Sequence, residues 1–356
     1  MGSNVITTEP FDPHAATPAA WDAFHAFHRA RSQAEDPDEP NLPNADFEHN
    51  ARQQWPFWKA SRILALHDGM IVGNIGLSIR REGTKDYAAF APFVTVWGGV
   101  LPSWRRQGVA TALMHRLLAF MDQHGNATAT FHARSLEGHA FLTAIGAMQK
   151  QLEVENRLDF AGLDWTELTR WEAAAPTGLE WEVHAGRVPL ERLAALIPSF
   201  TSLIADAPTG DVDRPPNRYD LQGYVAGYEN ADRSGGEHLL VMLLDVNEVA
   251  GMCEGWWDAR FPDRVSQYLT AVARPWRGRG LAKALKARML RLVREQQPGV
   301  AMMSTYNAVS NAPMLSINTR LGFIRHKEIG TYQIRRDALA EWLETRPGRP
   351  SAPITA

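Results

Sequence analysis

The chain of 356 residues contains a single cysteine, Cys253. One cysteine excludes an internal disulfide and any metal site built from several thiolates. No apolar run approaches the roughly 18 residues that a membrane-spanning helix needs, and the N-terminus lacks the basic start and apolar stretch of a signal peptide. These absences lead us to expect a cytoplasmic protein with no membrane partner and no metal.

The sequence also lacks an excess of charge of one sign. Its 37 lysines and arginines are balanced by 40 aspartates and glutamates, which gives a net charge of −3. Because nucleic-acid-binding domains carry a basic footprint, we expect no nucleic-acid partner. The 45% of hydrophobic and 22% of charged residues are ordinary for a globular protein, and the chain is long enough for two domains with separate cores.

A glycine-rich segment occurs twice. The first copy, VLPSWRRQGVATAL, spans residues 100–113, and the second, VARPWRGRGLAKAL, begins 172 positions later, so that Arg277 takes the place of Arg105. In each copy an apolar run ends, a turn with Pro and Trp follows, and Arg-x-x-Gly-x-Ala opens a helical pattern. Backbone N–H groups at a helix N-terminus bind phosphate groups, and glycine lets the backbone come close to them. Both segments are therefore predicted to hold a pyrophosphate.

The likeness between the two halves extends beyond this turn. Residues 68–73 match residues 245–251 as the turn of a β-hairpin, and residues 142–147 match residues 318–323. A period of about half the chain is too long for a solenoid and indicates two copies of one domain. The expected parts are an N-terminal domain (1–163), a connector (164–178) that Trp165, Leu168 and Trp171 predict to be packed, a C-terminal domain (179–346) and a flexible tail (347–356).

Each half follows the same predicted order: strand, helix, helix, three strands, pyrophosphate turn, helix, strand, helix, strand. Segment 152–160 is expected to close the first sheet and segment 325–335 the second. This order, the two turns and the stretch 305–323 resemble the GNAT superfamily of acyl-CoA-dependent N-acyltransferases, over nearly the whole chain. The tandem arrangement is similar to that of mycothiol synthase and related two-domain acetyltransferases. The resemblance implies an α/β fold (α+β, with a mixed sheet) in which each half is a twisted central sheet flanked by helices.

The resemblance further implies acetyl-CoA as co-substrate. In this family the strand before the turn separates from the next strand, the pantetheine arm inserts between them, and backbone amides hold the thioester carbonyl. Asn311 falls where the family has an asparagine that contacts the cofactor arm, although asparagine is also favoured as a helix N-cap. The residues expected to bind the cofactor are Thr270, Ala271, Val272, Arg277, Gly278, Arg279, Gly280, Leu281, Ala282 and Asn311 in the second half, and Gly98, Gly99, Val100, Arg105, Arg106, Gln107, Gly108, Val109 and Ala110 in the first half.

The second half is expected to be the catalytic one, because it keeps more polar residues. Asn318 falls where many GNAT enzymes carry a tyrosine that protonates the leaving thiolate; asparagine is no acid at neutral pH but can hydrogen-bond to sulfur, so Tyr306 or a water is the alternative. No carboxylate lies within residues 265–272. The acids just before this strand are candidates for the base, although each can be a solvated loop charge instead, and an ordered water relay is an equal alternative. The candidates for the base are Glu254, Asp258 and Asp263, and the catalytic set is Glu254, Tyr306 and Asn318.

Asp206 and Asp211 lie between the first two predicted helices of the second half, a segment that lines the acceptor site in similar folds. Two carboxylates there would bind a cationic amine, and the alternative interpretation is a solvated turn. The predicted function is transfer of an acetyl group from acetyl-CoA to a primary amine of a small molecule, by direct attack in a ternary complex, in a monomer or homodimer. A protein or peptide N-acetyltransferase, and a sensor or scaffold that binds acyl-CoA without turnover, are the alternatives.

Overall fold

The computed structural model describes residues 5–216 and 218–346, and none of the helices in these ranges is long and apolar enough to cross a membrane. The predicted tail, residues 347–356, lies outside them. The chain divides into two compact units. Unit 1 comprises Met1–Gln151, Asp211–Pro215 and Gly330–Ala356, and unit 2 comprises Leu152–Gly210 and Pro216–Ile329.

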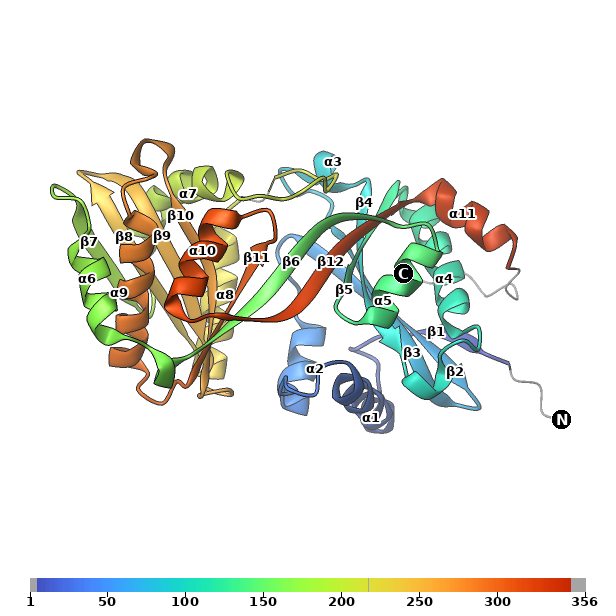
Figure 1. The fold of residues 1–356 in the computed structure, drawn as a ribbon. Helices are drawn as coiled ribbons and strands as arrows, with labels where there is room; N and C mark the ends of the chain where they lie inside the picture. Colours follow the sequence, from blue (N-terminus) through green and yellow to red (C-terminus); the bar gives the residue numbers. More distant parts are fainter. Residues whose placement is uncertain (1–4, 217, 347–356) are drawn as a thin grey trace. The chain divides into compact units, whose positions relative to one another are not determined.

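Unit 1 is built on a mixed sheet in the order β1-β2-β3-β4-β5-β12, in which β4 and β5 are parallel and the other pairs that we describe are antiparallel (Figure 1). Alternate residues of β2 face opposite sides: Ile63 and Ala65 pack with α4, and Leu64 packs with α1. The elements are β1 (Thr7–Pro10), α1 (Pro18–Glu35), α2 (Asn44–Arg52), β2 (Trp58–His67), β3 (Met70–Arg80), α3 (Tyr87–Phe90), β4 (Phe93–Val100), η1 (Pro102–Trp104), α4 (Val109–His124), β5 (Thr128–Ala133), α5 (Leu136–Ala144), β12 (Ile324–Arg335, from Gly330) and α11 (Arg336–Glu344).

Unit 2 repeats this plan with a mixed sheet in the order β6-β11-β10-β9-β8-β7, in which β10 and β11 are parallel. One core lies between the sheet and α9, and a second lies between the sheet and helices α7 and α8 (Figure 1). The mixed α/β fold expected from the sequence is thus confirmed. The elements are β6 (Met148–Asp159), η2 (Phe160–Gly162), α6 (Trp165–Ala173), β7 (Glu180–Ala185), α7 (Leu190–Ala205), α8 (Leu221–Ser234), β8 (Glu237–Asp245), β9 (Glu248–Trp257), β10 (Arg264–Val272), η3 (Arg274–Trp276), α9 (Leu281–Gln296), β11 (Met302–Ala308) and α10 (Ala312–Leu321).

The connector between the halves forms α6, which packs on α9. Arg291 Nε donates to Glu172 Oε2 at 2.7 Å, and the guanidinium of Arg294 lies 3.9 Å from the ring centroid of Trp165. The prediction of a packed connector is confirmed, and the segment belongs to unit 2 rather than standing between the units.

The last strand of each half pairs within the other unit. Strand β6 pairs with β11, from Glu153 opposite Ala308 to Asp159 opposite Met302, and β12 pairs with β5, from Gly330 opposite Ala133 to Arg335 opposite Thr128. The expectation that residues 152–160 close the first sheet and residues 325–335 the second is therefore wrong. The alternation of a strand determines which of its faces is buried and leaves open which sheet it joins, and in a duplicated domain either terminal strand fits either sheet.

Candidate active site

In unit 2, β10 separates from β11 halfway along its length. The parallel pairing runs from Arg264 opposite Met302 to Gln267 opposite Thr305 and ends there, whereas the antiparallel pairing with β9 continues to Val272. A register shift with β9 lies between Gln267 and Thr270. Such a β-bulge bends its strand. From residue 268 to residue 272 the edge of β10 that faced β11 is open, and its backbone groups, apart from the Val272 carbonyl, which accepts from Arg277, are available to an inserted ligand.

Unit 1 has the same opening between β4 and β5. Their pairing ends at Val96 opposite Phe131, while β4 continues along β3 to Val100. Here Gly98 takes a positive φ of 134°, and a Cβ atom at this position would lie 2.2 Å from the carbonyl oxygen of Asn74. Only glycine can therefore form this bend.

Each opened strand leads into a turn that starts a helix with glycine in the left-handed conformation. Gly280 has φ 84° and ψ 0° before α9, and Gly108 has φ 81° and ψ −4° before α4. Neither helix start has a side-chain cap. In α9 the N–H of Lys283 donates to the Gly280 carbonyl at 3.0 Å, whereas the N–H groups of the first two residues of each helix have no partner within the helix and remain available to a ligand. A Cβ built at Gly108, Gly278 or Gly280 would meet nothing within 4 Å. Open space in front of unbonded N–H groups fits an anionic pyrophosphate.

An arginine braces each turn in the same way. Arg277 Nε donates to the carbonyl of Val272 at 3.0 Å, and Arg105 Nε donates to that of Val100 at 3.4 Å. Arg106 has φ 62°, where unit 2 has Gly278 with φ 74°. The two turns thus share one backbone path, and the first half achieves it with a side chain in a region that favours glycine.

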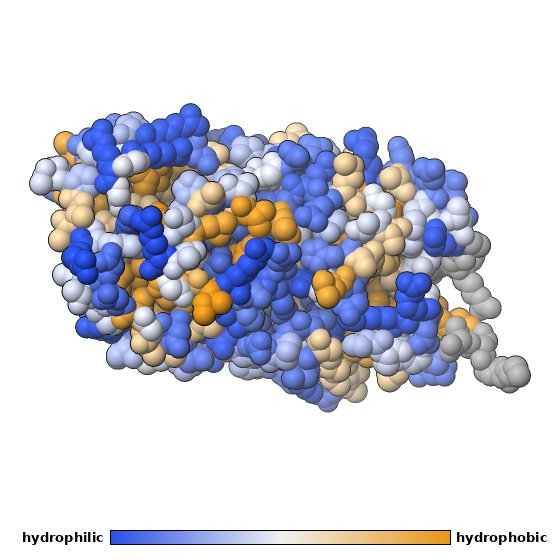
Figure 2. Space-filling model, in the orientation of Figure 1, coloured by the Kyte–Doolittle hydropathy of each residue, from blue (hydrophilic) through white to orange (hydrophobic). Residues whose placement is uncertain are grey.

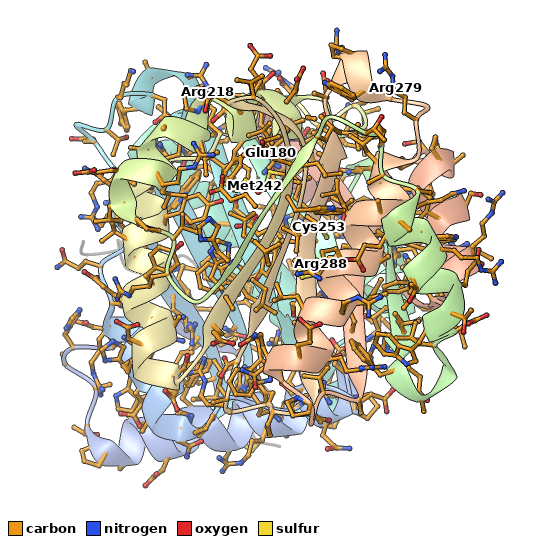
Figure 3. All side chains as sticks on the ribbon, turned by 90° about the vertical axis from the view of Figure 1, so that its left-hand side faces the viewer. Glu180, Arg218, Met242, Cys253, Arg279 and Arg288 are labelled. Carbon is orange, nitrogen blue, oxygen red and sulfur yellow. The ribbon has the colours of Figure 1, made fainter. Side chains whose placement is uncertain are left out.

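Other residues expected at the cofactor site have defined roles in the fold. Leu281 and Val109 bury their side chains, so only their backbone N–H groups could contact a ligand. Arg279, at the upper edge of Figure 3, lies over the ring of Trp276 at 4.8 Å. Asn311 is the N-cap of α10, with its Oδ1 accepting from the N–H of Met314 at 3.4 Å. The N-cap interpretation is confirmed, and contact with the cofactor arm stays a prediction.

A buried polar cluster supports the bulge from the side of α9. Cys253 Sγ, in the middle of the sheet in Figure 3, lies 3.0 Å from Gln267 Nε2 and 3.2 Å from Thr270 Oγ1. Lys286 on α9 donates to Gln267 Oε1. Burial lowers the pKa of this lysine to about 8. The two residues that flank the bulge are therefore held by the same cluster.

Glu254 lies in the middle of β9 and is buried, so it is not the solvated loop charge that is one of its two interpretations. Its buried carboxylate accepts hydrogen bonds from Tyr219 Oη at 2.7 Å, Tyr224 Oη at 2.9 Å and His238 Nε2 at 3.0 Å. Burial alone would raise the pKa of Glu254, but the three donors together hold it below its usual range. Burial and this carboxylate raise the pKa of both tyrosines. Glu254 is thus an anion with its lone pairs occupied, which is unfavourable for accepting a proton.

The other two acids considered for the base form ion pairs with neighbouring arginines. Asp258 Oδ1 accepts from Arg260 Nε at 2.9 Å, and Asp263 Oδ1 from Arg264 Nε at 3.4 Å. Tyr219, Tyr224 and His238 around Glu254 were not predicted as site residues from the sequence. One signal was available: Tyr224 and Tyr228 are four residues apart, a spacing that places both side chains on one face of a helix, and Tyr228 Oη lies 3.0 Å from Nδ1 of the same His238.

Asn318 and Tyr306 differ in how far their side chains are exposed to solvent. Asn318 on α10 is fully buried and donates through Nδ2 to Asn307 Oδ1 at 2.6 Å. Tyr306 on β11 is 40% exposed and immediately follows Thr305, the last β11 residue paired with β10. Because side chains alternate along a strand, Tyr306 points to the face opposite to Asn307. Figure 2 shows apolar surface over α10 and β11 in this region.

The structure places Asp206 and Asp211 in different units. Asp206 accepts from Arg274 Nη2 at 2.6 Å and from Arg277 Nη2 at 2.7 Å. Both arginines lower the pKa of Asp206, and the hydrogen bond from Arg274 has the largest effect. The backbone N–H of Asp211 donates to the carbonyl of Lys150 within unit 1. The two carboxylates therefore do not form one amine site within a unit, and Asp206 is an ion-pair partner of the pyrophosphate turn.

We expect Asp206→Asn to change the affinity for acetyl-CoA rather than the KM of any amine. The substitution removes a negative charge beside Arg274 and Arg277, while Arg277 stays anchored to Val272. Affinity should rise by no more than a few-fold, since exposed ion pairs contribute little. Calorimetric titration at low and high salt measures this; a raised amine KM with unchanged acetyl-CoA affinity would restore the amine-binding role.

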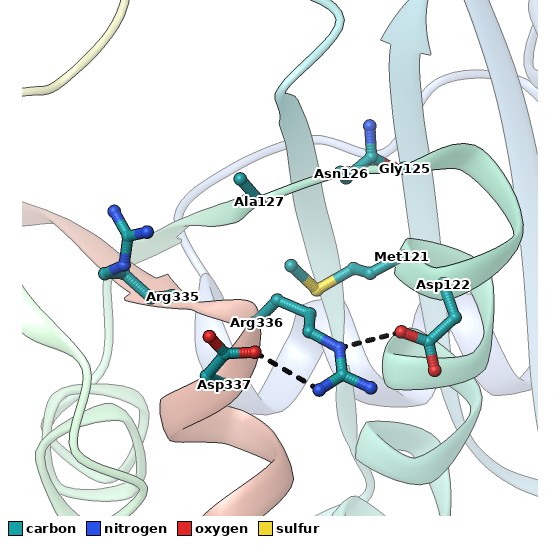
Figure 4. A pocket seen from close by; sticks show the side chains of 8 residues that line it. All are labelled: Met121, Asp122, Gly125, Asn126, Ala127, Arg335, Arg336 and Asp337. Carbon is teal, nitrogen blue, oxygen red and sulfur yellow. Dashed lines mark hydrogen bonds and ion pairs between the residues drawn. The ribbon is translucent and has the colours of Figure 1, made fainter.

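A hollow of about 300 Å³ in unit 1 lies at the far end of α4 from the turn (Figure 4). Three of its charged residues pair with one another: Arg336 donates to Asp122 at 2.8 Å and to Asp337 at 3.2 Å. Helix α4 has 16 residues, so roughly 24 Å separates its two ends. The hollow is thus remote from the opened strand and is not part of the candidate site.

Comparisons with known proteins agree with this geometry. The family profile described as "Acetyltransferase (GNAT) family" matches residues 21–143 and again residues 198–323. A tandem GNAT protein from the clavulanic acid biosynthesis pathway, solved without acetyl-CoA, has a TM-score of 0.71 and 19% identity, covering 93% of this chain and 99% of its own. A GCN5-related N-acetyltransferase from Sphaerobacter thermophilus has a TM-score of 0.63 and 17% identity, covering 98% of each chain. No curated protein sequence matches significantly.

At these identities the likeness to the solved structures shows only a shared fold. The two profile matches together span more than half of the chain, which is sufficient to assign the family. Each match contains an opened strand and the glycine turn that follows it. The chain therefore belongs to the GNAT family of acetyltransferases and carries two copies of its domain.

Proposed function

We propose that the protein transfers an acetyl group from acetyl-CoA to a primary amine of a small molecule, by direct attack in a ternary complex, with the chemistry in unit 2. One observation carries the proposal: the bulged strand β10 opens away from β11 and ends in a glycine turn that begins an uncapped helix. A thioester arm and a pyrophosphate, joined in one ligand, need these two features at this spacing.

The residues of unit 2 divide the work. Backbone N–H groups of Gly278 to Ala282 would hold the pyrophosphate, and the open edge of β10 from Thr270 to Val272 would hold the pantetheine arm. Bound acetyl-CoA supplies an acyl thioester that an amine can attack. Tyr306, beside the opening and partly exposed, is our candidate for the group that delivers a proton to the departing sulfur, since a phenol can donate one.

A specific observation favours a second candidate, a sensor that binds acyl-CoA without turnover. The amide nitrogen of Asn318 donates to Asn307, and the carboxylate of Glu254 accepts from three donors. Neither group is poised for proton transfer, so N-acyl transfer requires Tyr306 or a water to act.

Thiol release from acetyl-CoA, measured across a panel of primary amines, separates the two candidates. An acetyltransferase should release thiol only when an accepted amine is present, and Tyr306→Phe should lower kcat while leaving acetyl-CoA affinity unchanged. Saturable acetyl-CoA binding with no thiol release for any amine would support the sensor.

We expect Gly108→Asp to reduce turnover less than Gly280→Asp does. Both substitutions place a carboxylate in a left-handed position in front of a pyrophosphate turn, but unit 1 has buried Leu142 where unit 2 has Asn318. The kcat/KM of the two variants, measured with one amine, tests this prediction. The opposite ranking would move the catalysis to unit 1.

A further inference from the structure

One face of the unit 1 sheet carries a group of cations. Arg62 on β2 lies with its guanidinium carbon 4.6 Å from the ring centroid of Phe24 on α1 and 5.3 Å from that of Phe47 on α2. His28 and Arg31 lie on the same helix α1. Burial and the charges of Arg31 and Arg62 lower the pKa of His28 to about 4. These groups therefore share one region of positive potential.

The group extends to the opened part of β4. A Cβ atom at Gly99 would lie 3.2 Å from both Cδ and Nη1 of Arg31, and 2.9 Å from Oε1 of Glu35. Gly99 lies beyond Val96, where the pairing of β4 with β5 ends. Arg31 thus reaches the same stretch of strand at which the unit 1 opening begins.

Three polar atoms in this region are buried without a hydrogen-bond partner among the described residues. They are Nη1 of Arg62, Nε of Arg31 and Oδ1 of Asn74. Asn74 is the residue opposite Gly99 in the pairing of β3 with β4. Buried polar groups are nearly always hydrogen-bonded in native proteins, so three together indicate that a polar ligand completes this region.

The nearby carboxylates do not neutralise the group. Glu35 Oε2 is 3.8 Å from Arg31 Nη1, and Glu35 Oε1 is 3.7 Å from Arg105 Nη2. Arg105 also pairs through Nη1 with Glu137 at 3.3 Å. These acids lie next to Arg31 and Arg105, and no ion pair with Arg62 is seen among the described residues. Glu48 accepts from His25 at 3.1 Å and from Arg52 at 2.9 Å. The region therefore keeps an excess of positive charge.

Unit 2 differs at the corresponding positions. In unit 1, Arg62 is the residue opposite Gly76, and in unit 2, Leu240 is the residue opposite Glu254. Arg62 and Leu240 occupy corresponding positions because the two sheets align at Gly73, opposite Val100, and at Gly251, opposite Val272. Gly76 and Glu254 each lie three residues beyond these glycines. The same face thus carries a cation in unit 1 and an apolar residue next to a buried acid in unit 2.

We propose that unit 1 binds a ligand by a carboxylate group, held by Arg31 and Arg62 beside Gly99. A guanidinium binds a carboxylate through two parallel hydrogen bonds, which would supply partners for the buried nitrogens. The carboxylate belongs either to a dicarboxylic acyl group carried on CoA or to a free amino acid. The first source rests on the proposed acyl-CoA site of unit 1, and the second does not.

Calorimetric titration of full-length Gly280→Asp, in which unit 1 supplies the acyl-CoA site, tests the first source. Succinyl-CoA should bind about tenfold or more tightly than acetyl-CoA, because hydrogen bonds between charged groups are the stronger class. Adding Arg62→Met should remove this preference and leave acetyl-CoA affinity unchanged. For the second source, L-amino acids should raise the Tm of the wild-type protein more than the corresponding amides do. This difference should disappear in Arg62→Met.

Stability separates a binding role of Arg62 from a structural one. Because Nη1 of Arg62 lacks a partner, Arg62→Met should leave Tm unchanged or raise it. The matched control is Arg80→Met: Arg80 also lies over aromatic rings, 4.8 Å from that of Phe57, but Arg80 Nε donates to Asp86 at 2.8 Å. Arg80→Met should therefore lower Tm and keep the ligand preference. Arg62→Lys, which keeps the charge without the planar fork, should retain part of the preference and serves if Arg62→Met does not fold.

Each negative result has a separate meaning. If neither succinyl-CoA nor any amino acid is preferred over its uncharged counterpart, or if Arg62→Met keeps the preference, the carboxylate site is overturned while acyl transfer in unit 2 is untouched. If acetyl-CoA and succinyl-CoA both fail to bind, the proposed acyl-CoA site of unit 1 is wrong, and the comparison of amino acids with amides decides the carboxylate site.

Discussion

Gly280→Asp is expected to abolish acetyl-CoA binding in unit 2. The residue has φ 84° directly before α9, and its side chain would project into the open space in front of the helix N-terminus. A carboxylate there faces the pyrophosphate, and two like charges about 4 Å apart near a protein surface repel by up to about 4 kcal/mol. Affinity should fall by on the order of 100-fold or more. Isothermal titration calorimetry measures both affinity and stoichiometry.

Two control variants separate charge from backbone strain. Gly280→Ala adds a Cβ at the same positive φ without a charge and should weaken binding far less. Gly299→Asp adds the same charge in the loop after α9, where a Cβ also meets nothing within 4 Å, and it should leave binding unchanged. A folded Gly280→Asp protein with wild-type affinity and stoichiometry would show that the turn does not hold the pyrophosphate.

Glu254→Gln is expected to lower the free energy of unfolding by about 1.5–3 kcal/mol, the range for hydrogen bonds to charged groups. The substitution removes the negative charge that accepts hydrogen bonds from Tyr219, Tyr224 and His238. It also replaces one of the accepting oxygens by an amide N–H₂ group, which cannot accept a hydrogen bond. For a unit of this size the Tm should fall by roughly 5–10 °C. Glu248→Gln, at the exposed start of the same strand, is the matched control and should change Tm very little.

The pH dependence of this loss has a definite sign. The pKa of Glu254 in the folded protein lies below its ordinary value of 4.5, so the folded state favours the carboxylate and its contribution is present at higher pH. That contribution is lost as the pH falls through the folded pKa. The difference in Tm between wild type and Glu254→Gln should be largest near neutral pH and should shrink below about pH 4. An equal difference at every pH would mean that the charge itself contributes nothing.

The glycine turns could be predicted from the sequence because local geometry alone determines them. A helix start with φ near +80° requires glycine at Gly108 and Gly280, and the same letters recur at the same spacing in both halves. The mixed fold and the packed connector follow for similar reasons, since hydrophobic periodicity marks helices and strands along the chain.

The polar groups of the site could not be placed in this way, because their partners are distant in sequence. From the sequence, Glu254 can be interpreted as a solvated acid. In the fold it is surrounded by His238 from β8, Tyr224 from α8 and Tyr219 from the segment before α8. From the sequence, Asp206 can be interpreted as a ligand of the substrate, but in the structure it forms ion pairs with Arg274 and Arg277. Charges and hydroxyls carry no periodic signal, so only the tertiary structure reveals which of them are already neutralised.

The pairing of β12 with β5 has a consequence for how the protein is made. Thr130 and Gln333, hydrogen-bonded across these strands, are 203 positions apart in the chain. During translation β5 leaves the ribosome long before the strand that covers its edge, and uncovered edges invite pairing with other chains. Contacts of such long range also slow folding. A polypeptide that ends after its first half would therefore be a fragment awaiting its last strand, and the two copies of the domain must mature together.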